Sequence, residues 1–284
     1  RGLLVTVSQL NIVAGILAAL VSNYLIAETM GLAPEANAWR WMFGAQAAPA
    51  SLFLVSVLLI PESPRWLAHC GRHQEALTTL NRLGYDDGEG ELSRIEASFH
   101  GGQVVRESLL QKRYLKPLLL VIALAAFNQL DGINAILYYV TDIFRMAGFA
   151  ETDAFKQSAV VGAVNLVFTI VGMALIDRVG RRYLLLAGSI TFILSHALAA
   201  WVILTGSGGW LAVVAAGGIV ASHAYSQGAV VWVCINELLP NSIRAAGSSA
   251  ACFVLWGLAI IVSTAFAVMI GSWGGMVFIF FAAM

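Results

Sequence analysis

The chain has 284 residues, of which 59% are hydrophobic and 11% are charged, and its formal net charge at pH 7 is zero. Soluble domains carry about 25% charged residues, so this composition excludes an ordinary soluble domain and predicts that lipid surrounds most of the chain. A zero net charge gives no reason to expect nucleic acid as a partner. The three cysteines, Cys70, Cys234 and Cys252, show no paired spacing, which argues against a disulfide framework or a thiolate metal site.

Seven apolar stretches are long enough to cross a bilayer as helices, which takes roughly 20 residues, and an eighth begins near the end. They cover residues 3–26, 41–60, 117–144, 158–176, 183–204, 210–239, 245–270 and from about 273 onward. Lipid admits only helices or closed barrels, and these stretches are too long for barrel strands, so the predicted class is an all-α, multi-pass membrane protein. The chain opens at Arg1 and closes inside an apolar stretch, and we therefore expect a fragment.

The basic residues are distributed unevenly between the loops. When alternate loops are assigned to the same side, all but three of the 16 Lys and Arg residues gather on one side. The three exceptions are Arg40, Arg145 and Lys156. Because basic loops stay on the cytoplasmic side of a membrane, this distribution places the 61–116 segment in the cytoplasm. We expect the membrane to be a plasma or bacterial inner membrane.

The 61–116 segment is the longest polar region, and short amphipathic helices are predicted in it. Apolar side chains recur at helical spacing within residues 72–83, and the stretch from Gly84 to Gly90 is expected to break the helix. His69 and His73 are four residues apart and could hold zinc if both lay on one helix. No acidic partner stands at the expected spacing, so we expect a solvated helix and no metal site.

Four short motifs occur in order along the chain. Pro-Glu-Ser-Pro-Arg-Trp-Leu stands at 61–67, Asn-Gln-Leu-Asp-Gly-Ile-Asn-Ala-Ile-Leu-Tyr-Tyr at 128–139, Asp-Arg-Val-Gly-Arg-Arg at 177–182 and Glu-Leu-Leu-Pro-Asn-Ser-Ile-Arg at 237–244. In this order, and at these positions relative to the apolar stretches, the motifs resemble those of the sugar porters of the major facilitator superfamily. The resemblance covers nearly the whole chain.

This resemblance implies a partial major facilitator bundle, running from about the fifth span of the family to part of the twelfth. Residues 1–60 would be the last two spans of the N-terminal bundle, 61–116 a cytoplasmic helical linker domain, and 117–284 the C-terminal six-helix bundle with its last span cut short. In major facilitator transporters, two such bundles face each other across a site at the middle of the membrane.

Charged residues at the cytoplasmic ends of the spans could form ion pairs that open and close with conformation. The arginines of the 177–182 turn could hold carboxylates such as Glu237 or Glu62 on the facing bundle, as the matching residues of sugar porters imply. Alternatively, they serve as positive anchors at helix ends. The predicted cytoplasmic gate consists of Glu62, Arg65, Asp177, Arg178, Arg181, Arg182, Glu237 and Arg244.

A sugar site requires amides, which both donate and accept hydrogen bonds, and an aromatic surface for the C–H face of the ring. Polar side chains within spans usually face the protein interior or a water-filled cavity. The resemblance matches six such residues to sugar-binding positions of the family: Gln9, Asn128, Gln129, Asn134, Asn165 and Trp232. The alternative role of these amides is hydrogen bonding between helices.

The chain departs from the family pattern at several positions. Where many sugar porters carry asparagines around a tryptophan, the aligned residues are Leu255, Trp256 and Ala259, which removes two hydrogen-bonding groups and leaves the choice of sugar open. The span over 210–239 lacks the usual prolines, so its bend is expected at Gly228. Asp131 is unusual within a span and is a candidate for proton coupling, or for capping a helix that restarts after a break before Gly132.

The sequence therefore predicts a transporter that moves a monosaccharide, a hexose or a pentose, by alternating access, with proton coupling left open. The alternatives are a polyol transporter, with inositol as substrate, and a sugar sensor with a transporter fold. An enzyme is not expected, because no nucleotide-binding or hydrolase motif occurs and the intramembrane His196 and His223 have no evident acidic partner in sequence. No cofactor is expected.

Overall fold

The computed structural model describes residues 2–31, 37–100, 108–109 and 111–284, with the side chains of residues 2–7, 100, 177 and 229 left out. By its internal contacts the chain divides into two compact units. The first comprises Arg1–Ala45 and Leu109–Met284, and the second comprises Gln46–Ser108. All regular secondary structure in the described ranges is helical, which confirms the predicted all-α class.

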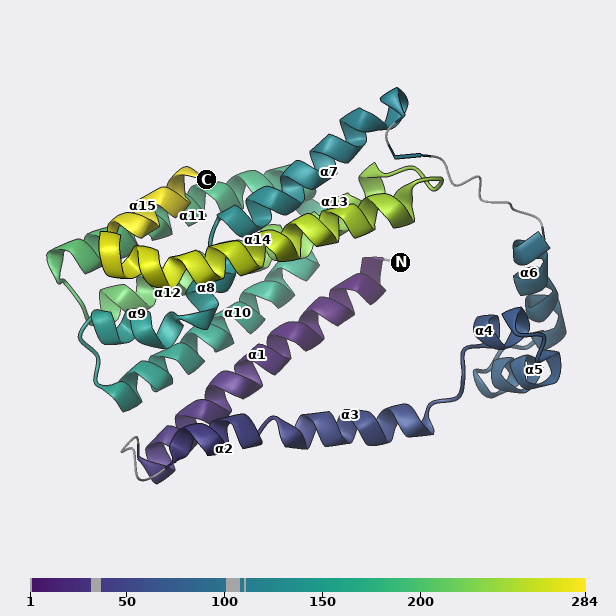
Figure 1. Cartoon of the computed structure of the whole chain (residues 1–284), viewed down its shortest axis with the longest axis horizontal. Coiled ribbons are helices and arrows are strands. Elements are labelled where there is room, and N and C mark those ends of the chain that lie inside the picture. Colours follow the sequence, from purple (N-terminus) through teal and green to yellow (C-terminus); the bar gives the residue numbers. More distant parts are fainter. Residues whose placement is uncertain (1, 32–36, 101–107, 110) are drawn as a thin grey trace. The chain divides into compact units, whose positions relative to one another are not determined.

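The first unit is a bundle of long helices with several short ones (Figure 1). The long helix α1 (Gly2–Met30) runs beside α10 (Glu151–Val179), while α7 (Lys112–Leu130) runs beside α14 (Arg244–Trp273). The other helices of this unit are α2 (Ala38–Gly44), α8 (Ile133–Tyr138), α9 (Val140–Met146), α11 (Arg181–Thr205), α12 (Trp210–Tyr225), α13 (Gln227–Leu238) and α15 (Met276–Ala283).

Seven helical stretches of the described residues are long and apolar enough to cross a membrane, as the sequence predicts. They are Ser8–Met30, Ala38–Leu59, Lys112–Tyr138, Glu151–Ile176, Arg181–Thr205, Trp210–Leu238 and Arg244–Trp273. The eighth predicted stretch corresponds to the short helix α15. The chain is therefore a multi-pass integral membrane protein.

The predicted span 117–144 is interrupted at two points and forms α7, α8 and α9. The first break lies at Asp131 and Gly132, where the sequence predicts it. Gly132 has a φ of +81°, and a Cβ placed there would lie 2.7 Å from the ring of Phe281. Glycine is therefore required twice over, by backbone conformation and by the close approach of α15. The amide N–H of Ile133, at the start of α8, donates to Oδ1 of Asp131 at 3.0 Å.

The predicted span 210–239 is interrupted between α12 and α13. The prediction of a bend at Gly228 is wrong, because Gly228 already belongs to α13. The break lies at Ser226, whose φ is −114° and ψ is −89°. The hydroxyl of Ser226 donates to the carbonyl of Ser222 at 2.5 Å, and its amide donates to the carbonyl of His223 at 3.2 Å. A serine that bonds back to the preceding turn in this way tends to bend a helix.

An aromatic cluster fills the core between α9, α11, α14 and α15. Phe144, Phe266, Phe278 and Phe281 are among its fully buried members, and Phe266 stacks on Phe281 with ring centroids 6.1 Å apart. The His196 ring is fully buried in the same cluster, 4.2 Å from the ring of Phe192. This packing fixes α15 against the break between α7 and α8.

The second unit contains α3 (Ala47–Leu59), α4 (Pro64–His69), α5 (His73–Arg82) and α6 (Gly88–His100). Its small core joins Leu67 and Ala68 of α4 to Ala76 of α5. The predicted amphipathic helix over 72–83 is confirmed as α5, but the break after it is shorter than predicted because α6 begins at Gly88.

The placement of His69 and His73 on one helix is wrong. His69 ends α4 and His73 begins α5, because the turn at Gly71, with φ +75°, separates the two helices. His73 Nδ1 lies 2.6 Å from Oε1 of Glu96, while the His69 ring packs against Phe99 with centroids 5.5 Å apart. The two imidazoles therefore have different partners. Within the described ranges no cluster of three His, Cys, Asp or Glu side chains could hold a metal ion.

Candidate sugar-binding cavity

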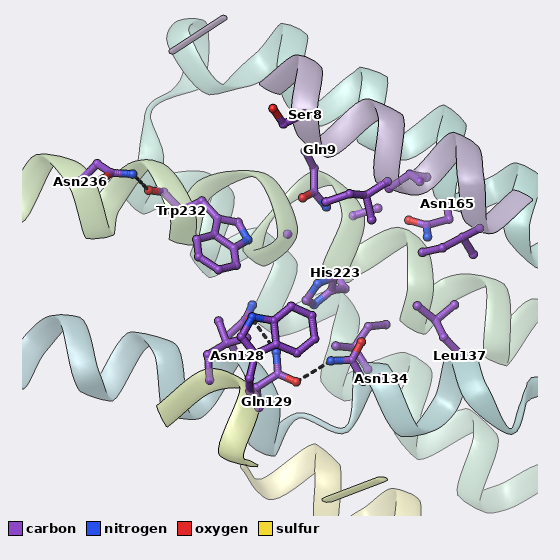
Figure 2. A pocket seen from close by; sticks show the side chains of 18 residues that line it. Ser8, Gln9, Asn128, Gln129, Asn134, Leu137, Asn165, His223, Trp232 and Asn236 are labelled. Atoms are coloured by element: carbon purple, nitrogen blue, oxygen red, sulfur yellow. Dashed lines mark hydrogen bonds between the residues drawn. The ribbon is translucent and has the colours of Figure 1, made fainter. Parts of the chain in front are cut away.

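A cavity of about 270 Å³ lies within the first unit (Figure 2). Its walls come from α1, α10 and α14 and from both interrupted spans, α7–α8 and α12–α13. This volume is close to the lower end of the range for small-molecule sites, roughly 300–1,000 Å³. The polar residues among those that line it are Ser8, Gln9, Asn128, Gln129, Asn134, Asn165, His223, Trp232 and Asn236.

Three amides at the α7–α8 break form a hydrogen-bonded chain. Nε2 of Gln129 donates to Oδ1 of Asn128 at 3.1 Å, and Nδ2 of Asn134 donates to Oε1 of Gln129 at 2.7 Å. Asn128 and Gln129 are buried, with 6% and 4% of their surface exposed. The oxygen of Asn134 and the NH₂ group of Asn128 take no part in these two bonds. These three amides can therefore offer both an acceptor and a donor to a ligand hydroxyl.

The other amides come from helices far away in sequence. Gln9 is contributed by α1 and Asn165 by α10, and Asn165 is 6% exposed. Asn236 on α13 donates to the carbonyl of Trp232 at 2.9 Å, one turn earlier in the same helix. The structure thus brings all six residues of the predicted sugar site to one cavity: Gln9, Asn128, Gln129, Asn134, Asn165 and Trp232.

Part of the cavity wall is apolar. Leu255 and Trp256 line it from α14, at positions where the sequence pattern of sugar porters has an amide before the tryptophan. Leu255 is 2% exposed, so its side chain fills the space an amide would occupy. Ala259 is not among the residues that line the cavity. A ligand would therefore meet hydrogen-bonding groups on one side and carbon surface on another.

The sequence did not place His223 at the candidate site. It lies on α12, lines the cavity, and its Nδ1 is 3.4 Å from Oδ2 of Asp131. The expectation that His223 has no acidic partner is therefore wrong. The two residues are 92 positions apart and lie on different spans, so no spacing rule could pair them. The one available signal was that both are ionisable residues next to predicted helix breaks.

Asp131 lines a second cavity of about 420 Å³, which it shares with Asn128 and Gln227. It is 3% exposed, and its Oδ1 accepts the amide N–H that begins α8. This bond agrees with the predicted alternative of a helix cap, although the N-cap residue of α8 itself is Gly132. The bond to Ile133 uses only Oδ1, which leaves Oδ2 for the contact with His223. The part of Asp131 in proton coupling therefore stays a prediction.

The predicted cytoplasmic gate is only partly assembled in the described residues. Nη2 of Arg181 lies 3.0 Å from Oε1 of Glu237 and joins the start of α11 to α13. Both residues lie within 117–284, the predicted C-terminal bundle, so this ion pair does not itself join that bundle to the facing one. Arg244 donates to the carbonyl of Leu239 at 3.1 and 3.2 Å instead of to a carboxylate.

The remaining residues of the predicted gate are Glu62, Arg65, Asp177, Arg178 and Arg182. Arg178 and Arg182 are exposed, and the side chain of Asp177 lies outside the described residues. Glu62 and Arg65 belong to the second unit, where Arg65 donates to Oγ of Ser98 at 3.2 Å. The involvement of these residues in a gate stays a prediction.

Comparison with known proteins gives a consistent family. The model described as "Sugar (and other) transporter" matches residues 1–284. The probable metabolite transport protein CsbC of Bacillus subtilis strain 168 is 36% identical over 281 residues, covering 96% of this chain and 59% of that protein. The arabinose-proton symporter of the same organism is 37% identical over 245 residues, covering 83% of this chain and 52% of that protein.

A solved structure shares the fold. The inward-open structure of the xylose transporter XylE from E. coli has a TM-score of 0.84 and 28% sequence identity, covering all of this chain and 59% of that one. The chain therefore spans between 52% and 59% of the length of these three proteins. The predicted major facilitator architecture is confirmed for the part that the chain represents.

Proposed function

We propose a transport function on the premise that this chain belongs to the sugar (and other) transporter family, whose model matches all 284 residues. The protein moves a monosaccharide, a hexose or a pentose, across a membrane by alternating access. Residues 1–60 supply the end of one helical bundle, 61–116 a cytoplasmic linker and 117–284 most of the second bundle. The substrate binds in the cavity lined by the interrupted spans.

The observation that carries this proposal is the convergence of amides from five helices on one cavity beside Trp232. A sugar hydroxyl both donates and accepts, and an amide is a neutral side chain that can do the same. An indole face can cover the C–H side of a sugar ring, where hydroxyls are absent. Among the described residues that line this cavity, His223 is the one acidic or basic side chain, which suits a neutral ligand with many hydroxyls.

The apolar wall limits the substrate class. Leu255 presents carbon where an amide would pair with a hydroxyl, and a buried hydroxyl without a partner is costly by about 1–3 kcal/mol. A cyclic polyol with a hydroxyl on every ring carbon is therefore a poorer fit than a pentose or a hexose. Arabinose and xylose, the substrates named for two of the similar proteins, are pentoses and agree with this preference.

Counterflow in liposomes tests the proposal directly. The product of the complete gene is reconstituted in liposomes preloaded with unlabelled sugar, and entry of radiolabelled xylose, glucose or inositol is followed, with L-glucose reporting leakage. Accumulation of xylose or glucose above the L-glucose level is expected. Accumulation of inositol alone would identify a polyol transporter. Binding of a sugar without any accumulation would indicate a sensor.

A further inference from the structure

Asp131 and His223 form the ionisable pair of the candidate site. Asp131 Oδ2 lies 3.4 Å from Nδ1 of His223, and Asp131 Oδ1 accepts the N–H of Ile133 at 3.0 Å. Both carboxylate oxygens therefore face a polar partner. The pair joins the break between α7 and α8 to the last turn of α12, immediately before the second break at Ser226.

The two members of the pair have unequal access to the cavity. The side chain of Asp131 is 4% exposed, whereas that of His223 is 16% exposed and lines the sugar cavity. Figure 2 shows the His223 ring among the amides that line this cavity. A Cβ at Gly228 would lie 3.2 Å from Nε2 of His223, so glycine there keeps this edge of the ring free of a neighbouring side chain. His223 can therefore present Nε2 to a ligand while Nδ1 faces Asp131.

Among the described residues that line either cavity, Asp131 and His223 are the two with acidic or basic side chains. On α11, the His196 ring packs against Phe192 and Phe281. On α12, Tyr225 bonds to Thr191 at 2.7 Å. The helices α1, α8, α10, α13 and α14 present only amide, hydroxyl and apolar side chains to the sugar cavity.

We propose that Asp131 and His223 together bind one proton that couples to sugar binding, with His223 as a sugar-contacting residue that Asp131 orients. This inference rests on the proposed transport function and deepens it. With a neutral imidazole the pair carries one net negative charge, and with a protonated imidazole it carries none. A sugar that fills the cavity displaces water from the pair and so disfavours the state with net charge. Sugar binding is then accompanied by uptake of one proton from the cavity water.

Thermodynamic linkage gives the direction in which the sugar affinity changes with pH. Because the sugar-bound state holds the proton more tightly, affinity for the sugar rises as pH falls through the titration of the pair. One linked proton can change the affinity by at most about tenfold per pH unit.

The test measures the binding of D-xylose and D-glucose to the purified product of the complete gene between pH 5.5 and 8 by calorimetry. In wild type, affinity should rise several-fold toward pH 5.5, and binding in buffers of different ionisation enthalpy should show proton uptake. In His223→Gln the slope should vanish, and in Asp131→Asn it should shrink. His73→Gln, which changes an exposed histidine of the second unit, should keep the wild-type slope.

The outcomes separate this inference from the proposed function. Sugar binding that is equally strong at every pH, or a wild-type slope that persists in His223→Gln, would overturn the inference and leave the transport function standing. Binding of neither sugar at any pH would overturn both.

Discussion

Asn134 donates a hydrogen bond of 2.7 Å to Gln129 across the break between α7 and α8. The bond joins two helical segments that Asp131 and Gly132 separate, and it leaves the oxygen of Asn134 available to the cavity. Hydrogen bonding among the amides therefore positions the site before a ligand arrives, so less ordering is needed on binding.

Replacing Asn134 by alanine should weaken sugar binding. The change removes a ligand contact and leaves the oxygen of the buried Gln129 without its donor, an effect of about 1–3 kcal/mol, or roughly 5- to 150-fold in affinity. Calorimetric titration with D-xylose measures it. Asn81→Ala, at an exposed position of α5, is the matched control and should bind as wild type does. Equal sugar affinities of the two variants would show that Asn134 does not contribute to sugar binding.

Replacing Gly132 by alanine should destabilise the fold. The φ of +81° costs a non-glycine residue about 1–3 kcal/mol, and the new Cβ would press on the Phe281 ring at 2.7 Å. Thermal unfolding followed by circular dichroism should show a lower Tm. Gly217→Ala on α12 is the matched control, because no atom lies within 4 Å of a Cβ there. If both variants unfold at the same temperature, the break does not require glycine.

Much of this organisation could be predicted from the sequence, because apolar length and chain breakers are local signals. The seven spans and the break at Gly132 are confirmed on this basis. The break at Ser226 was misplaced to Gly228, since a serine that bonds back to Ser222 carries no distinctive spacing. Gly228 instead lies beside the His223 ring.

The composition of the cavity depends on tertiary contacts. The six predicted binding residues meet at one cavity, and resemblance to a family, not periodicity, pointed to them. The pairing of Asp131 with His223 depends on how two interrupted spans pack, which the sequence of either span does not contain. The ion pair of Arg181 with Glu237, 56 positions apart, depends on helix packing in the same way.

Neutralising Glu237 should alter transport more than stability. The pair with Arg181 is 36% and 54% exposed, and such surface pairs contribute at most about 1 kcal/mol to folding. If the pair forms and separates during alternating access, Glu237→Gln should change the counterflow rate several-fold while Tm changes little. The double variant Arg181→Gln/Glu237→Gln should behave like the single variants. Additive effects in the double variant would show that the two residues act independently.

Substitutions of Trp232 should show whether an aromatic ring at this position contributes to sugar affinity. Trp232→Phe keeps an aromatic face toward the cavity, whereas Trp232→Ala removes it. We expect sugar affinity to fall in the order wild type, Trp232→Phe, Trp232→Ala, because burial of the sugar's C–H face needs the ring surface. Equilibrium dialysis with radiolabelled D-glucose gives the three affinities. Equal affinities for Trp232→Ala and wild type would place the sugar elsewhere.

The central claim is that the amides at the α7–α8 break hold a sugar, and the most direct test is equilibrium binding by wild type, Gln129→Ala and Gln74→Ala. Gln74 is an exposed glutamine of α5, so its variant controls for the loss of an amide outside the cavity. The account predicts saturable binding of D-xylose or D-glucose to wild type and Gln74→Ala, with at least about tenfold weaker binding to Gln129→Ala. Unchanged binding in a folded Gln129→Ala protein would contradict it.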